Sequence, residues 1–178
     1  MDAIEKGFDA LLTKVQKYDE KKEKLKGAVA KEEALLLARM GVETGPVISK
    51  IGLVMLERGK QDNAGELYDT KFYQEKMIVL GKTDPVEFRP DDISKKVTDQ
   101  FCVLSEEGKF YELMYSSDGF IVDSYRNLID PGEALEIYGY EIMFMLYRAM
   151  RDYLTAEKEL VDALQKVIDF LHPQEEEK

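Results

Sequence analysis

Two pairs of carboxylates are the residues in this chain whose types and spacing could do chemistry. Glu133 and Glu136 form an ExxE pair, and Glu159 and Asp162 form an ExxD pair. Carboxylate clusters of this kind hold Mg²⁺, and the bound ion polarises a phosphate and activates water. The pairs are therefore candidates for a carboxylate-metal phosphohydrolase.

These paired motifs resemble the magnesium-binding signature of the all-α nucleoside triphosphate pyrophosphohydrolases, and the resemblance covers these four residues. In that family the motifs converge from separate helices. Here both pairs fall on one predicted helix, 26 residues apart, which is about 39 Å at 1.5 Å per residue. Among 36 acidic residues such matches arise by chance. The phosphohydrolase is therefore a remote alternative to the two binding functions described below. We expect no catalytic residue, metal or cofactor.

Other catalytic groups are scarce in this sequence. The only histidine, His172, precedes Pro173 in a charged tail. The only cysteine, Cys102, lies in a predicted strand, where burial as a small apolar residue is expected. The sequence contains neither GxGxxG nor GxxxxGK[ST], so it lacks a glycine-rich phosphate loop. The protein is therefore more consistent with binding than with catalysis.

Composition narrows the class of protein further. The net charge of −11 opposes a nucleic-acid surface, which requires a concentrated positive field. The longest apolar run, residues 142–147, is too short to cross a membrane. One cysteine and no signal-peptide pattern indicate the cytoplasm. Abundant Lys and Glu with only two Asn are typical of a heat-adapted source.

Hydrophobic periodicity predicts helices in the first third of the chain. Residues 2–26 carry a heptad-like seam, with Lys22 in one slot. Gly27 and Gly45-Pro46 then suggest helix boundaries, which gives a second helix over 31–42 and a third over 46–58. The apolar positions of the first seam are Ile4, Phe8, Leu11, Val15, Tyr18 and Leu25.

The remainder of the chain predicts strands and then a long helix. Residues 66–98 are ambiguous, and residues 100–126 predict a three-stranded antiparallel meander with turns at Gly108 and Gly119. Residues 133–171 predict one continuous helix. We therefore predict one domain over 1–178 of α+β class: a helical part at 1–60, a mixed part at 66–130 and the long helix, which packs on both.

The helix segment 138–154 carries the candidate binding surface. Phe144 and Met145 lie on its polar edge, where they would face water unless something covers them. Methionine adapts its shape to variable partners as well as to irregular cores. The alternatives are core packing, a protein interface and a small-ligand pocket. The candidate interface or pocket residues are Tyr140, Met143, Phe144, Met145, Tyr147 and Met150.

The two terminal regions carry opposite charge. Residues 14–31 hold seven Lys against three acids, and residues 157–178 hold seven acids against three Lys. They could attract each other within one chain or across a dimer, or they could be two solvated faces. Within one chain, the late half of the long helix would contact residues 2–26.

These patterns favour a non-catalytic cytoplasmic interaction or assembly protein of unknown pathway, homodimeric through helical surfaces. The alternative is a small-ligand sensor with a Tyr/Met-lined pocket between the meander and the long helix. In that case six tyrosines would gather beside Glu112, Asp123 or Arg126. They are Tyr111, Tyr115, Tyr125, Tyr138, Tyr140 and Tyr147. We expect partners to be a second copy or another protein, with a small molecule as a further option, and neither nucleic acid nor membrane.

Overall fold

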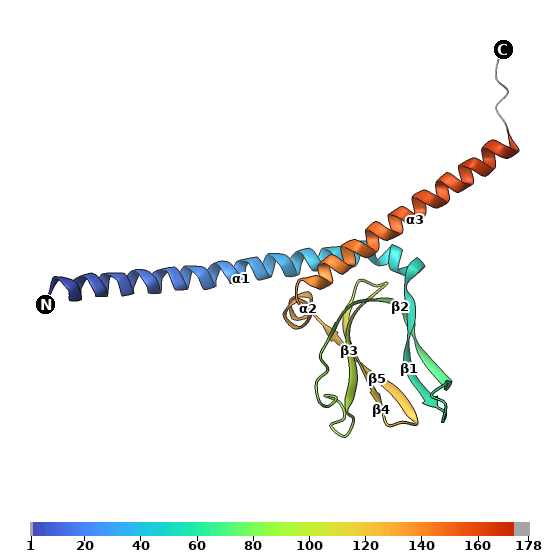
Figure 1. Cartoon of the computed structure of the whole chain (residues 1–178), viewed down its shortest axis with the longest axis horizontal. Helices are drawn as coiled ribbons and strands as arrows, with labels where there is room; N and C mark the ends of the chain where they lie inside the picture. Colours follow the sequence, from blue (N-terminus) through green and yellow to red (C-terminus); the bar gives the residue numbers. More distant parts are fainter. Residues whose placement is uncertain (1, 173–178) are drawn as a thin grey trace, which may run out of the picture.

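A closed β-barrel with long helices attached to one end makes up the computed structural model, which describes residues 2–172 (Figure 1). The elements in chain order are α1 (Ala3–Ile51), β1 (Leu53–Gln61), β2 (Leu67–Thr83), β3 (Val97–Ser105), β4 (Phe110–Ser117), β5 (Ile121–Ile129), α2 (Pro131–Tyr138) and α3 (Glu141–Leu171). Residues 173–178, where the sequence suggests a charged tail, lie outside the described residues.

The barrel has the strand order β1-β2-β3-β4-β5, and β5 closes on β1. All pairs are antiparallel. Closure depends on β2, whose 17 residues pair with β1 up to Met77 and with β3 from Met77 onward. Irregular register in both ladders lets β2 bend from one neighbour to the other. The closing β1–β5 ladder is short, from Arg58↔Asp123 to Lys60↔Ile121.

Alternation along the strands divides the apolar residues into two cores. One core lies inside the barrel around Met77, Val103 and Leu113. The other lies outside it, where Leu80, Cys102 and Leu104 meet the helices. The helices contribute Leu37, Ile48, Ala134, Ile142, Met143 and Leu146 to this outer core.

Residues 3–51 form a single helix, so the prediction of three N-terminal helices is wrong. Gly45 suggested a helix end, but a Cβ there would lie 2.5 Å from the backbone oxygen of Glu106. Glycine is needed at that point because the β3–β4 turn packs directly on the helix. Pro46 lies inside the helix. The close approach of the barrel stabilises a helix that local propensity would interrupt.

The predicted helix over 46–58 is also wrong in its second half. The helix ends at Ile51, and Leu53–Gln61 is strand β1, paired with both β2 and β5. Short apolar runs such as LVML fit a buried strand as well as a helix. The ambiguous residues 66–98 contain β2, which supplies the second missing strand. Pairing between distant strands therefore determined the secondary structure of β1 and β2.

The three strands expected over 100–126 are present as β3, β4 and β5, but they belong to the closed five-stranded barrel. The three-stranded meander is therefore wrong as a description of the sheet. The protein is nevertheless an α+β fold with a long C-terminal helix. Among residues 2–172, no helix is long and apolar enough to cross a membrane.

The helix predicted over 133–171 is broken into α2 and α3 at Gly139. Gly139 has φ +76° and ψ −179°, a conformation essentially restricted to glycine. Asp130 begins α2 with a capping box, in which its side chain accepts from Gly132 and Glu133 N–H groups. The break sets α2 apart from α3, whose first turns bury Ile142, Met143 and Leu146.

Candidate functional site

The N-terminal part of α1 projects from the barrel without contacting it. Every residue from Asp2 to Glu32 is exposed, and we call residues 3–32 the N-terminal arm. This arm is about 45 Å long at 1.5 Å per residue. Its apolar seam is solvent-exposed throughout, from 79% at Ile4 to 55% at Val29. Helices gain most of their stability from packing of an apolar face, and this part of α1 packs on nothing among the described residues.

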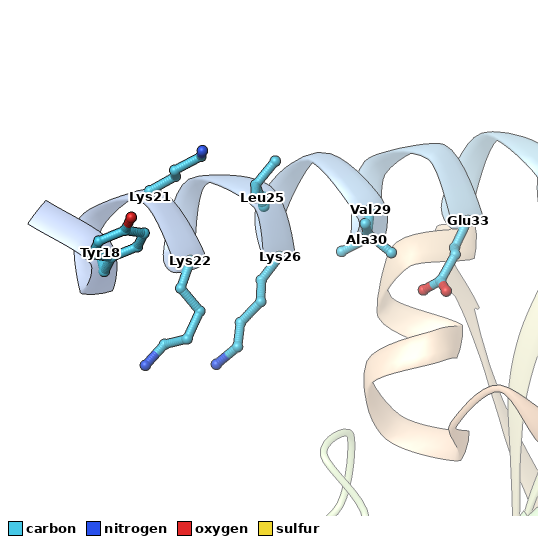
Figure 2. A pocket seen from close by; sticks show the side chains of 8 residues that line it. All are labelled: Tyr18, Lys21, Lys22, Leu25, Lys26, Val29, Ala30 and Glu33. Carbon is cyan, nitrogen blue, oxygen red and sulfur yellow. The ribbon is translucent and has the colours of Figure 1, made fainter.

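Figure 2 shows the arm close to the barrel, where a shallow apolar hollow runs along the helix. The hollow is lined only by residues of α1. One helix cannot enclose a small ligand, because no second element covers it. The hollow is therefore an open apolar surface of α1 and not an enclosed pocket. Its lining residues are Tyr18, Lys21, Lys22, Leu25, Lys26, Val29, Ala30 and Glu33.

The end of α3 forms a second projecting segment. Every residue from Leu154 to Leu171 is exposed, and we call residues 154–171 the C-terminal arm. The face of α3 that buries Ile142 and Leu146 against the barrel continues along this arm as an uncovered stripe. The members of the stripe are Leu154, Leu160, Val161, Leu164, Val167, Ile168 and Leu171, all at least half exposed.

The two arms leave the barrel in opposite directions (Figure 1). The late half of α3 therefore does not contact residues 2–26 of the same chain, contrary to the expectation for a single chain. The helices meet near the barrel instead, where Lys50 Nζ donates to Tyr153 Oη at 3.0 Å. Each arm thus carries an apolar seam that no other part of residues 2–172 covers.

The candidate residues of the segment 138–154 separate into buried and exposed groups. Met143 is buried in the outer core at 4% exposure, and Met150 is half-buried. Phe144 and Met145 are 52% and 40% exposed, so the described residues cover each of them only in part. Tyr140 and Tyr147 are also exposed. The exposed members lie where α3 crosses the end of the barrel, between the two arms.

The six tyrosines do not gather in one pocket. Tyr111 and Tyr115 belong to the core inside the barrel, whereas Tyr138 packs against the outer core. Tyr140 and Tyr147 are exposed on α3. Burial raises the pKa of Tyr115 to about 12, so this hydroxyl stays protonated at neutral pH.

The charged residues proposed to accompany them are separated too. Arg126 lies between the rings of Tyr73 and Tyr111, 4.5 Å from each centroid, and pairs with Glu75. Glu112 lies under α2, where its Oε1 accepts from Gln100 Nε2 at 2.5 Å and from Tyr138 Oη at 3.4 Å. Arg126 lies inside the barrel, because it contacts Tyr111, a residue of the inner core. Glu112 follows Tyr111 in β4, so its side chain points to the outside of the barrel wall.

The paired carboxylates do not form a metal centre within the described chain. Glu133 and Glu136 are in α2, and Glu159 lies 18 residues after the start of α3. That is about 27 Å along the axis of α3. Across residues 2–172, no group of three or more His, Cys, Asp or Glu could hold a metal ion. Cys102 is inert as a nucleophile, because burial raises its pKa to about 12.

An ionic network at the other end of the barrel could not be predicted from the sequence. Arg89, in the segment between β2 and β3, is 5% exposed. It donates to Asp91 at 2.9 and 2.5 Å and to Asp123 at 2.9 Å, and Lys95 also pairs with Asp123. The hydrogen bonds from Arg89 hold the pKa of Asp91 below its usual value.

Comparisons with protein-family models, curated proteins and solved structures each returned no match to this chain.

Proposed function

We propose that this protein is a non-catalytic cytoplasmic assembly protein that forms a homodimer through its two arms. The observation that supports the proposal is the pair of apolar seams, one on each arm, that the other described residues leave uncovered. Exposed seams of this length mark interaction sites in soluble proteins. The cytoplasmic setting is inferred from the single cysteine.

The occupant of each seam is the other arm of a second copy. The N-terminal arm is lysine-rich, with seven Lys against three acids over residues 14–31. The C-terminal arm is acidic, with Glu157, Glu159, Asp162 and Asp169 against Lys158 and Lys166 over residues 154–171. Opposite charge favours pairing of unlike arms over pairing of like arms. Because the arms of one chain point apart, this attraction requires a second molecule.

Two-fold symmetry makes the pairing antiparallel. Both α1 and α3 run across the barrel in the same general sense from N- to C-terminus (Figure 1). A two-fold axis near their crossing reverses the second copy, so each N-terminal arm meets the partner's C-terminal arm running the opposite way. The two contacts are then equivalent, as a closed dimer requires. The same axis would bring the exposed residues Phe144 and Met145 toward the centre of the dimer.

Each seam has one charged residue among its apolar positions, and the two charges are opposite. In α1 the steps of four and three from Ile4 to Val29 are apolar except at Lys22. In α3 the same steps from Tyr153 to Leu171 are apolar except at Glu157. Antiparallel alignment of Lys22 with Glu157 of the second copy puts Phe8 beside Leu171, and opposite charges then meet inside the contact.

The available burial is sufficient for a stable dimer. The C-terminal arm carries the seven aliphatic side chains of its stripe. At about 1.5 kcal/mol each, their burial contributes roughly 10 kcal/mol per arm pair. The loss of rigid-body freedom on association costs about 4–15 kcal/mol. Two equivalent arm pairs therefore outweigh that cost, and one pair alone would be marginal.

Light scattering across micromolar concentrations tests the dimer. We expect twice the 20.5 kDa mass of the chain. Lys22→Glu and Glu157→Lys should each weaken dimerisation about tenfold or more, because each variant places like charges in both contacts. An equimolar mixture of the two variants should dimerise again, since only the mixed dimer has opposite charges at both positions.

Matched controls identify the pairing. Lys24→Glu and Asp162→Lys make the same charge changes at exposed positions off the seams, and they should leave the mass unchanged. A clean monomer at all concentrations would refute the assembly function. If Glu157→Lys leaves the mass of the dimer unchanged, like arms pair with each other. That result would reject the antiparallel arrangement of unlike arms but would keep the homodimer.

A further inference from the structure

A polar hollow of about 410 Å³ is lined by residues of the segment 84–96 and of the turn between β4 and β5. Both segments lie at the end of the barrel away from the helices (Figure 1). The hollow is formed between them, on the outside of the barrel wall. Its volume falls within the range of about 300–1,000 Å³ that is typical of small-molecule sites. The hollow is lined by Arg58, Ser94, Lys95, Lys96, Ser116, Ser117, Asp118, Ile121 and Asp123.

The floor of the hollow is a ladder across three strands. Arg58 on β1 is the register partner of Asp123 on β5, and Asp123 is the partner of Ser116 on β4. Directly opposed residues in antiparallel strands present their side chains on the same face. Three polar side chains therefore lie in a row, in fixed order, and the rigid barrel holds them there.

The segment 84–96 forms the opposite wall and is held in place from beneath. Arg89 is buried and bonds to both Asp91 and Asp123, so its guanidinium joins the segment to the floor. Its backbone N–H also donates to Lys95 O at 3.0 Å. Lys95 and Lys96 are consequently presented at the hollow by an ordered backbone.

One hydroxyl in the hollow lacks a partner. Ser116 is 3% exposed, and its Oγ is the one buried side-chain polar atom without a hydrogen bond among the described residues. A buried polar group left unpaired costs about 1–3 kcal/mol. In native structures a buried hydroxyl generally has a protein, water or ligand partner, and a ligand that hydrogen-bonds to Ser116 would remove the cost.

The charges in the hollow favour an anion. Asp123 is already occupied by Arg89 and Lys95, and Asp118 accepts the backbone N–H groups of Phe120 and Ile121. Across residues 2–172, by contrast, Arg58 and Lys96 make no ion pair. The site thus offers two uncommitted cations in a protein whose net charge is −11.

We propose that this hollow binds the phosphate group of a small phosphorylated metabolite, with Arg58 and Lys96 as its cations and Ser116 as a hydrogen-bond donor. Cation–phosphate hydrogen bonds are roughly twice as strong as neutral ones. The hollow is larger than a bare ion needs, so the remaining space accommodates the neutral part of the metabolite. The site is far from both arms, and its test is independent of the dimer.

Amide chemical shifts of the full-length protein test the site, with inorganic phosphate, ribose 5-phosphate and ribose as probes at constant ionic strength. We expect ribose 5-phosphate to shift residues 94–96 and 116–123 and to bind at least tenfold more tightly than ribose. Stronger binding of inorganic phosphate than of the sugar phosphate would identify a free-anion site and reject the metabolite.

Three variants and one control assign the roles. Arg58→Gln and Lys96→Gln should each weaken binding of ribose 5-phosphate about tenfold, and Ser116→Ala about threefold. Arg58 and Lys96 are exposed, so their variants should fold normally. Lys109→Gln removes the same charge at the helical end of the barrel and should leave affinity unchanged. Equal losses in all the charge variants, or no localised shifts with any probe, would overturn the proposal.

Discussion

At the scale of single residues, the shape of this protein depends on where a side chain is missing. Gly45 permits the backbone of Glu106 to approach α1 so closely that a Cβ would lie 2.5 Å from its oxygen. Gly27, in the same helix, has no neighbouring atom within 4 Å. The two glycines look alike in the sequence, but only the first is required by packing.

Replacing each glycine by alanine should therefore have opposite effects. Gly45→Ala should lower the free energy of unfolding by about 2 kcal/mol, because the barrel must move away from the helix. Gly27→Ala should raise it by about 0.5–1 kcal/mol, since alanine is the better helix former. Urea unfolding followed by circular dichroism measures both. A stabilising Gly45→Ala would contradict the close packing of the turn on α1.

At the scale of elements, the break between α2 and α3 determines where the outer core forms. α2 begins at a capping box on Asp130 and ends at Gly139, and α3 starts again two residues later. The break lets α2 contribute Ala134, and α3 contribute Ile142 and Leu146, to the same cluster.

Gly139→Ala tests the importance of this break. Gly139 has φ +76°, which costs an alanine about 2 kcal/mol even though nothing crowds the site. We expect a loss of stability of that size in thermal or urea unfolding. Gly7→Ala, at an uncrowded helical position, is the matched control and should cause no loss. An unchanged stability for Gly139→Ala would mean that α2 and α3 can join without strain.

At the scale of the whole molecule, the barrel and the arms differ in what stabilises them. The barrel contains its own core and closes its sheet. The arms have only local hydrogen bonds, together with exposed ion pairs such as Lys22–Asp19, which contribute little. If a second copy covers the arms, their helicity must depend on protein concentration, whereas the order of the barrel must not.

Dilution should separate these two parts. Below the dissociation constant of the dimer, the helical signal at 222 nm should fall as the arms fray. The near-ultraviolet signal of the barrel tyrosines should persist, and the melting temperature of the dimer should rise with concentration. Glu157→Lys should show the same loss of helicity at higher concentration. A helical signal that stays constant down to concentrations where the protein is monomeric would show that the arms need no partner.

The sequence by itself determined the features that depend on local pattern. Residues 4–25 are helical, as their heptad period predicted, and the Asp-Gly turn at Gly119 joins β4 to β5. The opposite charges of the two terminal regions also follow from composition alone. Periodicity and turn chemistry act over a few residues, so they can be recognised without the fold.

The closure of the barrel, the continuity of α1 and the position of the polar hollow became known only from the tertiary structure. β1 is a strand because β2 and β5 pair with it, and those partners are distant in the sequence. Gly45 is helical because the β3–β4 turn packs there. The polar hollow joins residues 58, 94–96 and 116–123, which only strand register brings together. The physical reason is common to all of these: long-range contacts overrule local propensities, which differ by only about 1 kcal/mol per residue.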